Sequence, residues 1–133
     1  MEGGKVKKPI ISFKDLEIYR NTYKDSISIM TKIIPKLPDS EKYDLKDQLS
    51  RSCKAIPRLI AEGYAKRHQK LGFQKYLDDA LAECNETIVS LEQTKDIYGF
   101  LLDTNLCERL INSFNISAKQ IFTLRMTWRN FNK

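Results

Sequence analysis

The sequence is poor in the residues that build loops and reactive sites. Among 133 residues there are five glycines, four prolines, three cysteines and one histidine. Few glycines and prolines favour long regular elements over a loop-rich fold. A single histidine argues against the Glu-x-x-His ligand pairs of two-metal helical bundles, and the chain has no Cys-x-x-Cys pair and no glycine-rich phosphate loop. We therefore expect no enzymatic activity, no metal site and no cofactor.

Long hydrophobic runs are also missing. No apolar stretch approaches the roughly 18 residues that are needed to cross a bilayer. The opening residues, MEGGKVKKP, lack the apolar segment of a secretory signal. We therefore predict a cytoplasmic protein that has no membrane partner.

The cysteines are too few and too scattered to form a disulfide framework. Cys53, Cys84 and Cys107 are odd in number, and each lies on or beside an apolar stripe. We interpret them as buried free thiols rather than as disulfide partners or metal ligands.

What the sequence does contain is helical periodicity. In residues 48–67, a spacing of 100° per residue places four apolar side chains on one stripe and charged side chains opposite. The apolar stripe consists of Leu49, Cys53, Ile56 and Ile60. Pro57 lies inside this helix. Gly63 either closes the helix in a left-handed conformation or bends a helix that continues through Ala65.

Three further segments show the same periodicity. The first helix is predicted from Ser12 to about Ile34, because Pro35 disfavours helical geometry at the residue before it. Its inward face is predicted to be Phe13, Leu16, Tyr19, Tyr23, Ile27, Met30 and Ile34. The second helix is predicted to begin at Asp39 or Ser40. The third covers about residues 71–102, and the fourth begins at Asp103 or Thr104.

These segments predict an all-α fold. Four amphipathic helices joined by short links are typical of an up-down-up-down antiparallel four-helix bundle. No segment alternates with the two-residue period of a strand. We assign residues 12–133 to the bundle domain and residues 1–11 to a flexible basic N-terminal arm.

Positive charge is unevenly distributed along the chain, whose net charge is +6. No acid occurs in residues 63–77 or 109–133, whereas the third helical segment is rich in acid. Cations and aromatic rings alternate in both acid-free stretches, as in surfaces that bind phosphates and stack on unpaired bases. The candidate nucleic-acid-binding residues are Arg51, Arg58, Lys66, Arg67, Lys70, Lys75, Arg125 and Arg129.

The charge asymmetry leaves two functions open. The first is a non-enzymatic bundle that binds RNA or DNA with low specificity through a basic surface. The alternative is a protein–protein interaction scaffold, in which opposite charges on identical subunits serve self-assembly only. An enzyme is the least favoured class. His68 lies in a run of basic residues, and the carboxylates of the third helical segment are interpreted as a solvated helix face.

Several stretches resemble a known family. They are FKDLEIY (residues 13–19), EKYDLKDQLSRS (41–52), AIPRLIAEG (55–63) and FQKYLDDALAECNE (73–86). Over residues 12–128 the chain resembles the four-helix-bundle proteins encoded in intervening sequences of bacterial 23S rRNA genes. The resemblance implies a homo-oligomer, most simply a homopentamer. It also extends to the accessory variability determinant of diversity-generating retroelements, a basic pentamer, and so implies a reverse transcriptase as a partner.

Overall fold

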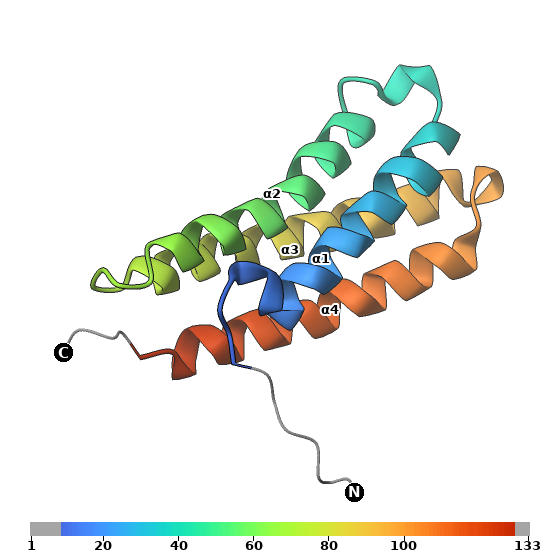
Figure 1. Cartoon of the computed structure of the whole chain (residues 1–133). Coiled ribbons are helices and arrows are strands. Elements are labelled where there is room, and N and C mark those ends of the chain that lie inside the picture. Colours follow the sequence, from blue (N-terminus) through green and yellow to red (C-terminus); the bar gives the residue numbers. More distant parts are fainter. Residues whose placement is uncertain (1–8, 130–133) are drawn as a thin grey trace, which may run out of the picture.

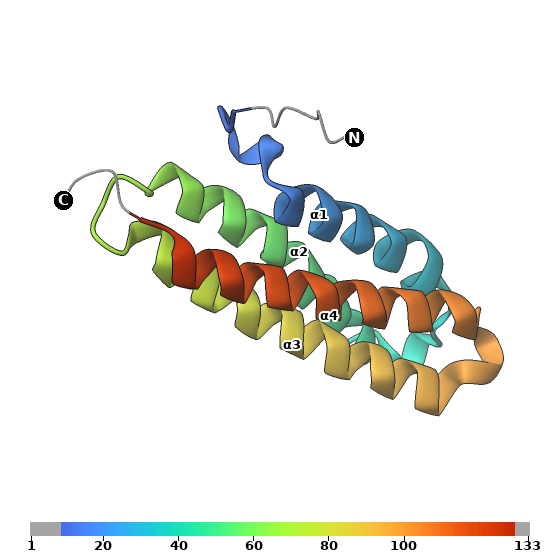
Figure 2. The ribbon, with the colours of Figure 1, turned by 90° about the horizontal axis from the view of Figure 1, so that it is seen from below.

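The computed structural model describes residues 9–129, which fold into a bundle of four α-helices (Figure 1). The helices are α1 (Glu17–Ser28), α2 (Leu45–Ala65), α3 (Gly72–Tyr98) and α4 (Thr104–Thr127). Consecutive helices run in opposite directions (Figures 1 and 2). α2 packs on α3, α3 packs on α4, and α1 lies against α2 and α4. The predicted all-α four-helix bundle is confirmed, and residues 9–129 contain no strand.

The apolar stripe of α2 forms the centre of the core. Leu49, Cys53, Ile56 and Ile60 are all fully buried, as predicted. The facing side chains come from α3 and α4, where Phe73, Leu77, Leu91, Phe114 and Ile121 are also fully buried. None of the helices in residues 9–129 is long and apolar enough to span a membrane.

Gly63 does not end α2. The helix continues to Ala65, and no glycine in the described residues has a positive φ. A Cβ atom at Gly63 would lie only 2.5 Å from the Cβ atom of Tyr76 on α3. The glycine is therefore needed for the close approach of α2 to α3 rather than for its backbone freedom.

The first helical segment is less regular than predicted. Phe13–Asp15 form a 3₁₀ turn, and Leu16 is extended at φ −79° and ψ 126°, so α1 begins only at Glu17. After Ser28 the chain forms a π-helical turn, Ile29–Ile33, and then a 3₁₀ turn, Ile34–Lys36, that contains Pro35. The predicted stop near Pro35 is correct, but much of the segment is not α-helical.

The predicted inward face of this segment is partly wrong. Tyr23 and Ile27 are 51% and 45% exposed, whereas Thr22 and Ser26 are buried. The two hydroxyls can lie inside because they donate to carbonyls of their own helix, Thr22 Oγ1 to Ile18 O and Ser26 Oγ to Tyr23 O, both at 2.7 Å. The extended Leu16 also changes the phase of the helix relative to Phe13.

The second helix begins later than predicted. Asp39–Glu41 form a separate 3₁₀ turn, and α2 starts at Leu45. The residue before α2, Asp44, has the non-helical angles φ −128° and ψ −104°, and Glu41 Oε1 accepts the amide of Leu45 at 3.1 Å. On α4, Asp103 caps the helix as predicted, by accepting the amide of Leu106 at 3.1 Å.

Glu41 also ties the α1–α2 connection to the end of α3. The hydroxyl of Tyr98 donates to Glu41 Oε2 at 2.5 Å. This hydrogen bond, followed by the one from the Leu45 amide, lowers the pKa of Glu41 below its ordinary value of 4.5. The stabilisation that it contributes is therefore complete above pH 4.5 and is lost as the pH falls through the lower pKa of the folded state.

We predict that Tyr98→Phe destabilises the bundle at pH 7, and that the difference from the wild type shrinks on acidification below pH 4.5. Urea denaturation at pH 7 and pH 3 measures this difference. Tyr43→Phe is the matched control, because Tyr43 is 86% exposed. If the loss of stability caused by Tyr98→Phe is the same at pH 7 and pH 3, the hydrogen bond between Tyr98 and Glu41 is contradicted.

The three cysteines are buried free thiols, as predicted. Burial raises the pKa of Cys53 and of Cys84 to about 12. The reactive thiolate is therefore scarce at these two positions at neutral pH.

Candidate nucleic-acid interface

Six of the eight candidate residues lie at one end of the bundle, where the α2–α3 link meets the end of α4 (Figure 1). The link, residues 66–71, is tight: Leu71 has a left-handed φ of 56°, and a Cβ at Gly72 would lie 2.0 Å from the Lys66 carbonyl oxygen. We call this group the basic end. It consists of Lys66, Arg67, Lys70, Lys75, Arg125 and Arg129.

Aromatic rings close the core beneath the basic end. The Trp128 ring meets Phe73 edge to face at 4.8 Å, and Phe73 meets Tyr64 in the same way at 5.9 Å. Tyr64 is only 6% exposed. Tyr64 therefore serves packing, whereas Tyr76 and Trp128 are partly exposed at this end, and Lys66 Nζ lies 5.0 Å from the Tyr76 ring centroid. Phe131, the last aromatic residue of the sequence pattern, lies outside the described residues.

Aromatic side chains also orient two of the cations. The guanidinium carbon of Arg67 lies 4.0 Å from the Tyr64 ring centroid, and its Nη1 donates to the Tyr64 carbonyl at 2.8 Å. Lys66 Nζ donates to the Tyr76 hydroxyl at 2.8 Å, and this bond raises the pKa of Lys66. Both side chains thus carry positive charge in fixed positions.

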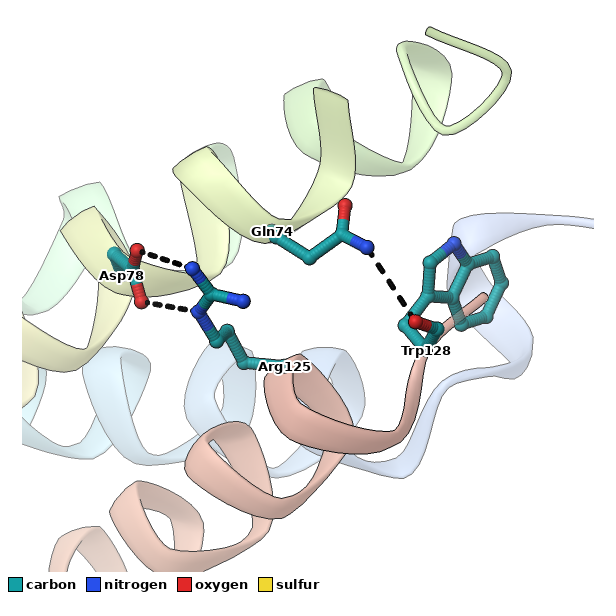
Figure 3. A network of polar contacts seen from close by, with 4 residues as sticks. All are labelled: Gln74, Asp78, Arg125 and Trp128. Carbon is teal, nitrogen blue, oxygen red and sulfur yellow. Dashed lines mark hydrogen bonds and ion pairs between the residues drawn. The ribbon is translucent and has the colours of Figure 1, made fainter. Parts of the chain in front are cut away.

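The two arginines at the end of α4 are both engaged, Arg125 with α3 and Arg129 with its own helix end. Arg125 makes two hydrogen bonds with the Asp78 carboxylate, Nε to Oδ1 at 2.9 Å and Nη2 to Oδ2 at 3.3 Å (Figure 3). Beside them Gln74 Nε2 donates to the Trp128 carbonyl at 3.4 Å. Arg129 donates to carbonyls at the C-terminus of α4. Because Asp78 neutralises Arg125, this arginine adds little free positive charge.

Lys70 and Lys75 are the most available cations of the basic end. Both are exposed, and neither forms an ion pair or a hydrogen bond with another side chain of residues 9–129. They flank the start of α3. Together with Lys66 and Arg67 they belong to the acid-free stretch of residues 63–77. These lysines can therefore contact phosphates without breaking an existing interaction.

The remaining two candidates lie elsewhere. Arg51 lies on α2, 15 residues before Lys66 at the end of that helix, which corresponds to about 22 Å, and its Nε pairs with Asp47 Oδ2 at 3.1 Å. Arg58 is exposed and lines a shallow groove between α1 and α2. The structure thus separates the eight residues into the basic end and two residues along α2.

The groove that includes Arg58 was not expected from the sequence. We call it the α1–α2 groove; it has a volume of about 280 Å³. It is lined by Phe13, Tyr19, Tyr23, Ser26, Ile27, Lys54, Pro57, Arg58 and Ala61. The sequence feature that indicates this groove is the aromatic stripe of the first helical segment, which we had predicted to lie in the core. Within residues 9–129 no group of three or more His, Cys, Asp or Glu side chains could hold a metal ion.

The fold and these surfaces define a small all-helical bundle protein with a basic end. The family model of the 23S rRNA-intervening sequence protein matches residues 14–122, which include α1 to α3 and most of α4. The chain belongs to this family. A search of curated proteins gave no match.

Proposed function

We propose that this protein is a non-enzymatic, homo-oligomeric bundle that binds RNA or DNA through the basic end as an accessory factor. The observation that carries the proposal is the pair of exposed, unengaged lysines, Lys70 and Lys75, beside the oriented cations Lys66 and Arg67. Lysines bind phosphates by releasing counterions, which needs a high density of positive charge and no base-reading motif. Low sequence specificity follows from this mode of binding.

Self-assembly strengthens such a surface. A pentamer, which the family resemblance implies, carries about +30 when the net charge of +6 is multiplied by five copies. Several basic ends on one particle also bind one polyanion with avidity. The exposed side chains of Tyr23 and Ile27, which border the half-buried rings of Phe13 and Tyr19 in the α1–α2 groove, support the homo-oligomeric part of the proposal, because a contiguous apolar surface is suited to contact with another protein.

A protein partner supplies any sequence selectivity in this proposal. A reverse transcriptase is the partner that we propose, and its support is the resemblance to the accessory variability determinant. Co-purification of the two tagged proteins from a common host tests this part separately from nucleic-acid binding.

We predict a steep salt dependence of RNA binding. Fluorescence anisotropy of a labelled single-stranded RNA is measured at several salt concentrations, with the mass of the free protein determined in parallel. Replacing Lys70 and Lys75 by glutamine is expected to lower affinity about tenfold at low salt and to reduce the slope of log K against log salt by about one to two. Single-stranded DNA of the same sequence shows whether the sugar matters.

The matched control removes the same charge at the opposite end of the bundle. Lys32 and Lys36 are exposed beside the α1–α2 connection, far along the bundle from the basic end. Their double glutamine variant is expected to bind RNA nearly as well as the wild type. Equal losses in both variants mean that binding depends on net charge alone, and this result contradicts a site at the basic end.

The second candidate function is a protein–protein scaffold. It is favoured by the α1–α2 groove together with the concentration of acid on α3. A confirmed oligomer that fails to bind RNA or DNA at low salt selects the scaffold.

A further inference from the structure

The α1–α2 groove presents a rigid row of aromatic rings. Phe13 meets Tyr19 edge to face at 4.8 Å, and Tyr19 stacks on Tyr23 at 5.9 Å between ring centroids. Tyr23 is 51% exposed and Ile27 is 45% exposed, although both belong to the most apolar stripe of the segment. Because the rings already pack on one another, a partner loses little side-chain entropy by ordering them.

Two cations line the same groove on the α2 side. Lys54 and Arg58 form no ion pair or hydrogen bond with another side chain in the described part of the chain. The other α2 residues of the lining are Pro57, which has no amide hydrogen to donate, and the small Ala61 one turn further along. The groove therefore matches a surface that combines small apolar side chains with carboxylates.

Such a surface is present on α3 of the same chain. Asp79, Ala82, Glu86 and Val89 are exposed and follow one another at three- and four-residue steps, so they share one helix face. Glu83 borders this face. We call these five residues the α3 acidic face.

Among residues 9–129, Arg51 is the one cation that acts on the pKa of Glu83 in the α3 acidic face. Burial and the neighbouring carboxylates of Glu86 and Asp79 raise the pKa of Glu83. Arg51 is the cation that opposes this shift, and it is already paired with Asp47. Cations supplied from outside the chain would therefore relieve the repulsion among these carboxylates.

The two surfaces lie on different sides of the bundle. α1 and α3 occupy opposite corners, because each packs on α2 and on α4. A chain whose α3 acidic face occupies the groove of its neighbour keeps its own groove free for the next copy. This arrangement is heterologous and leads to a ring if the rotation closes.

We propose that the α1–α2 groove takes the α3 acidic face of a second copy of this chain, with Lys54 and Arg58 facing the carboxylates. The inference deepens the homo-oligomeric part of the proposed function and rests on it. It does not depend on nucleic-acid binding, which is placed at the basic end.

Charge reversal tests the pairing of the two surfaces. The variants are Lys54→Glu with Arg58→Glu, Glu83→Lys with Glu86→Lys, and the quadruple variant that combines all four. Native mass spectrometry and light scattering give the mass of each, and circular dichroism confirms its helicity. Each double variant is expected to weaken assembly at least tenfold, whereas the quadruple variant assembles like the wild type. Mixing the two double variants is expected to restore assembly.

A control separates this inference from the proposed function. Lys70→Glu with Lys75→Glu reverses two charges at the basic end, and it is expected to abolish RNA binding while leaving assembly intact. The inference is overturned by a monomeric wild type at 100 μM, by double variants that assemble normally, or by a folded quadruple variant that stays monomeric. A monomeric wild type that captures an acidic peptide instead assigns the groove to another protein and also overturns the inference.

Discussion

Ile60→Asp is expected to abolish cooperative folding. Ile60 is fully buried at the C-terminal end of the α2 stripe, among the apolar side chains of the core. The loss of buried apolar volume costs about 3 kcal/mol, and an unpaired buried charge adds several more. A domain of this size has a total stability of roughly 5–15 kcal/mol. Far-UV circular dichroism during urea titration measures the loss.

The matched control places the same substitution on the surface. Ile116 is 50% exposed in the middle of α4, so Ile116→Asp is expected to change stability by less than about 1 kcal/mol. A folded Ile60→Asp protein with a midpoint near that of the wild type contradicts the assignment of the α2 stripe to the core.

Gly63→Ala is expected to destabilise the bundle by about 1–3 kcal/mol, the usual cost of overpacking. At an exposed position inside a helix, the same Gly→Ala change has the opposite effect and stabilises the protein by about 1 kcal/mol. The added Cβ would lie 2.5 Å from Tyr76 Cβ and 3.1 Å from Phe73 Cδ1. Because the Tyr76 Cβ is attached directly to the backbone of α3, a rotamer change cannot relieve the contact, and the helices must separate. The urea midpoint reports the change.

Gly99→Ala is the control for this prediction. A Cβ at Gly99 would lie 3.5 Å from Thr104 Cγ2, which is an ordinary van der Waals contact. This variant is expected to keep the wild-type midpoint within the equivalent of about 0.5 kcal/mol. If Gly63→Ala raises the midpoint, the helix propensity of alanine outweighs packing, and the close contact between α2 and α3 is refuted.

The sequence was sufficient to predict the bundle because three of its helices follow the α-helical period closely. The predicted stripe of α2 is fully buried, and the Asp103 cap is correct. The face of α1 was misassigned for a physical reason. A ranking by side-chain hydrophobicity places Tyr23 inside and Thr22 outside. In the structure the Thr22 hydroxyl donates a hydrogen bond to the Ile18 carbonyl of its own helix, and its small side chain fits the core.

The candidate site was predictable in its charges but not in its contacts. Acid-free stretches can be read directly from the sequence. The pairing of Arg125 with Asp78 joins residues 47 positions apart and depends on how α3 and α4 align. The α1–α2 groove was missed for the same reason as the α1 face, since its aromatic lining looked like core.

The hydroxyl-lined core face of α1 has a consequence for how the protein opens. With Thr22 and Ser26 at buried positions, α1 gains less from the hydrophobic effect than its neighbours, so local unfolding is least costly there. The same helix forms one wall of the α1–α2 groove. In the proposed assembly, a subunit docked in that groove binds only the form with α1 in place, so association and the local stability of α1 would be thermodynamically linked.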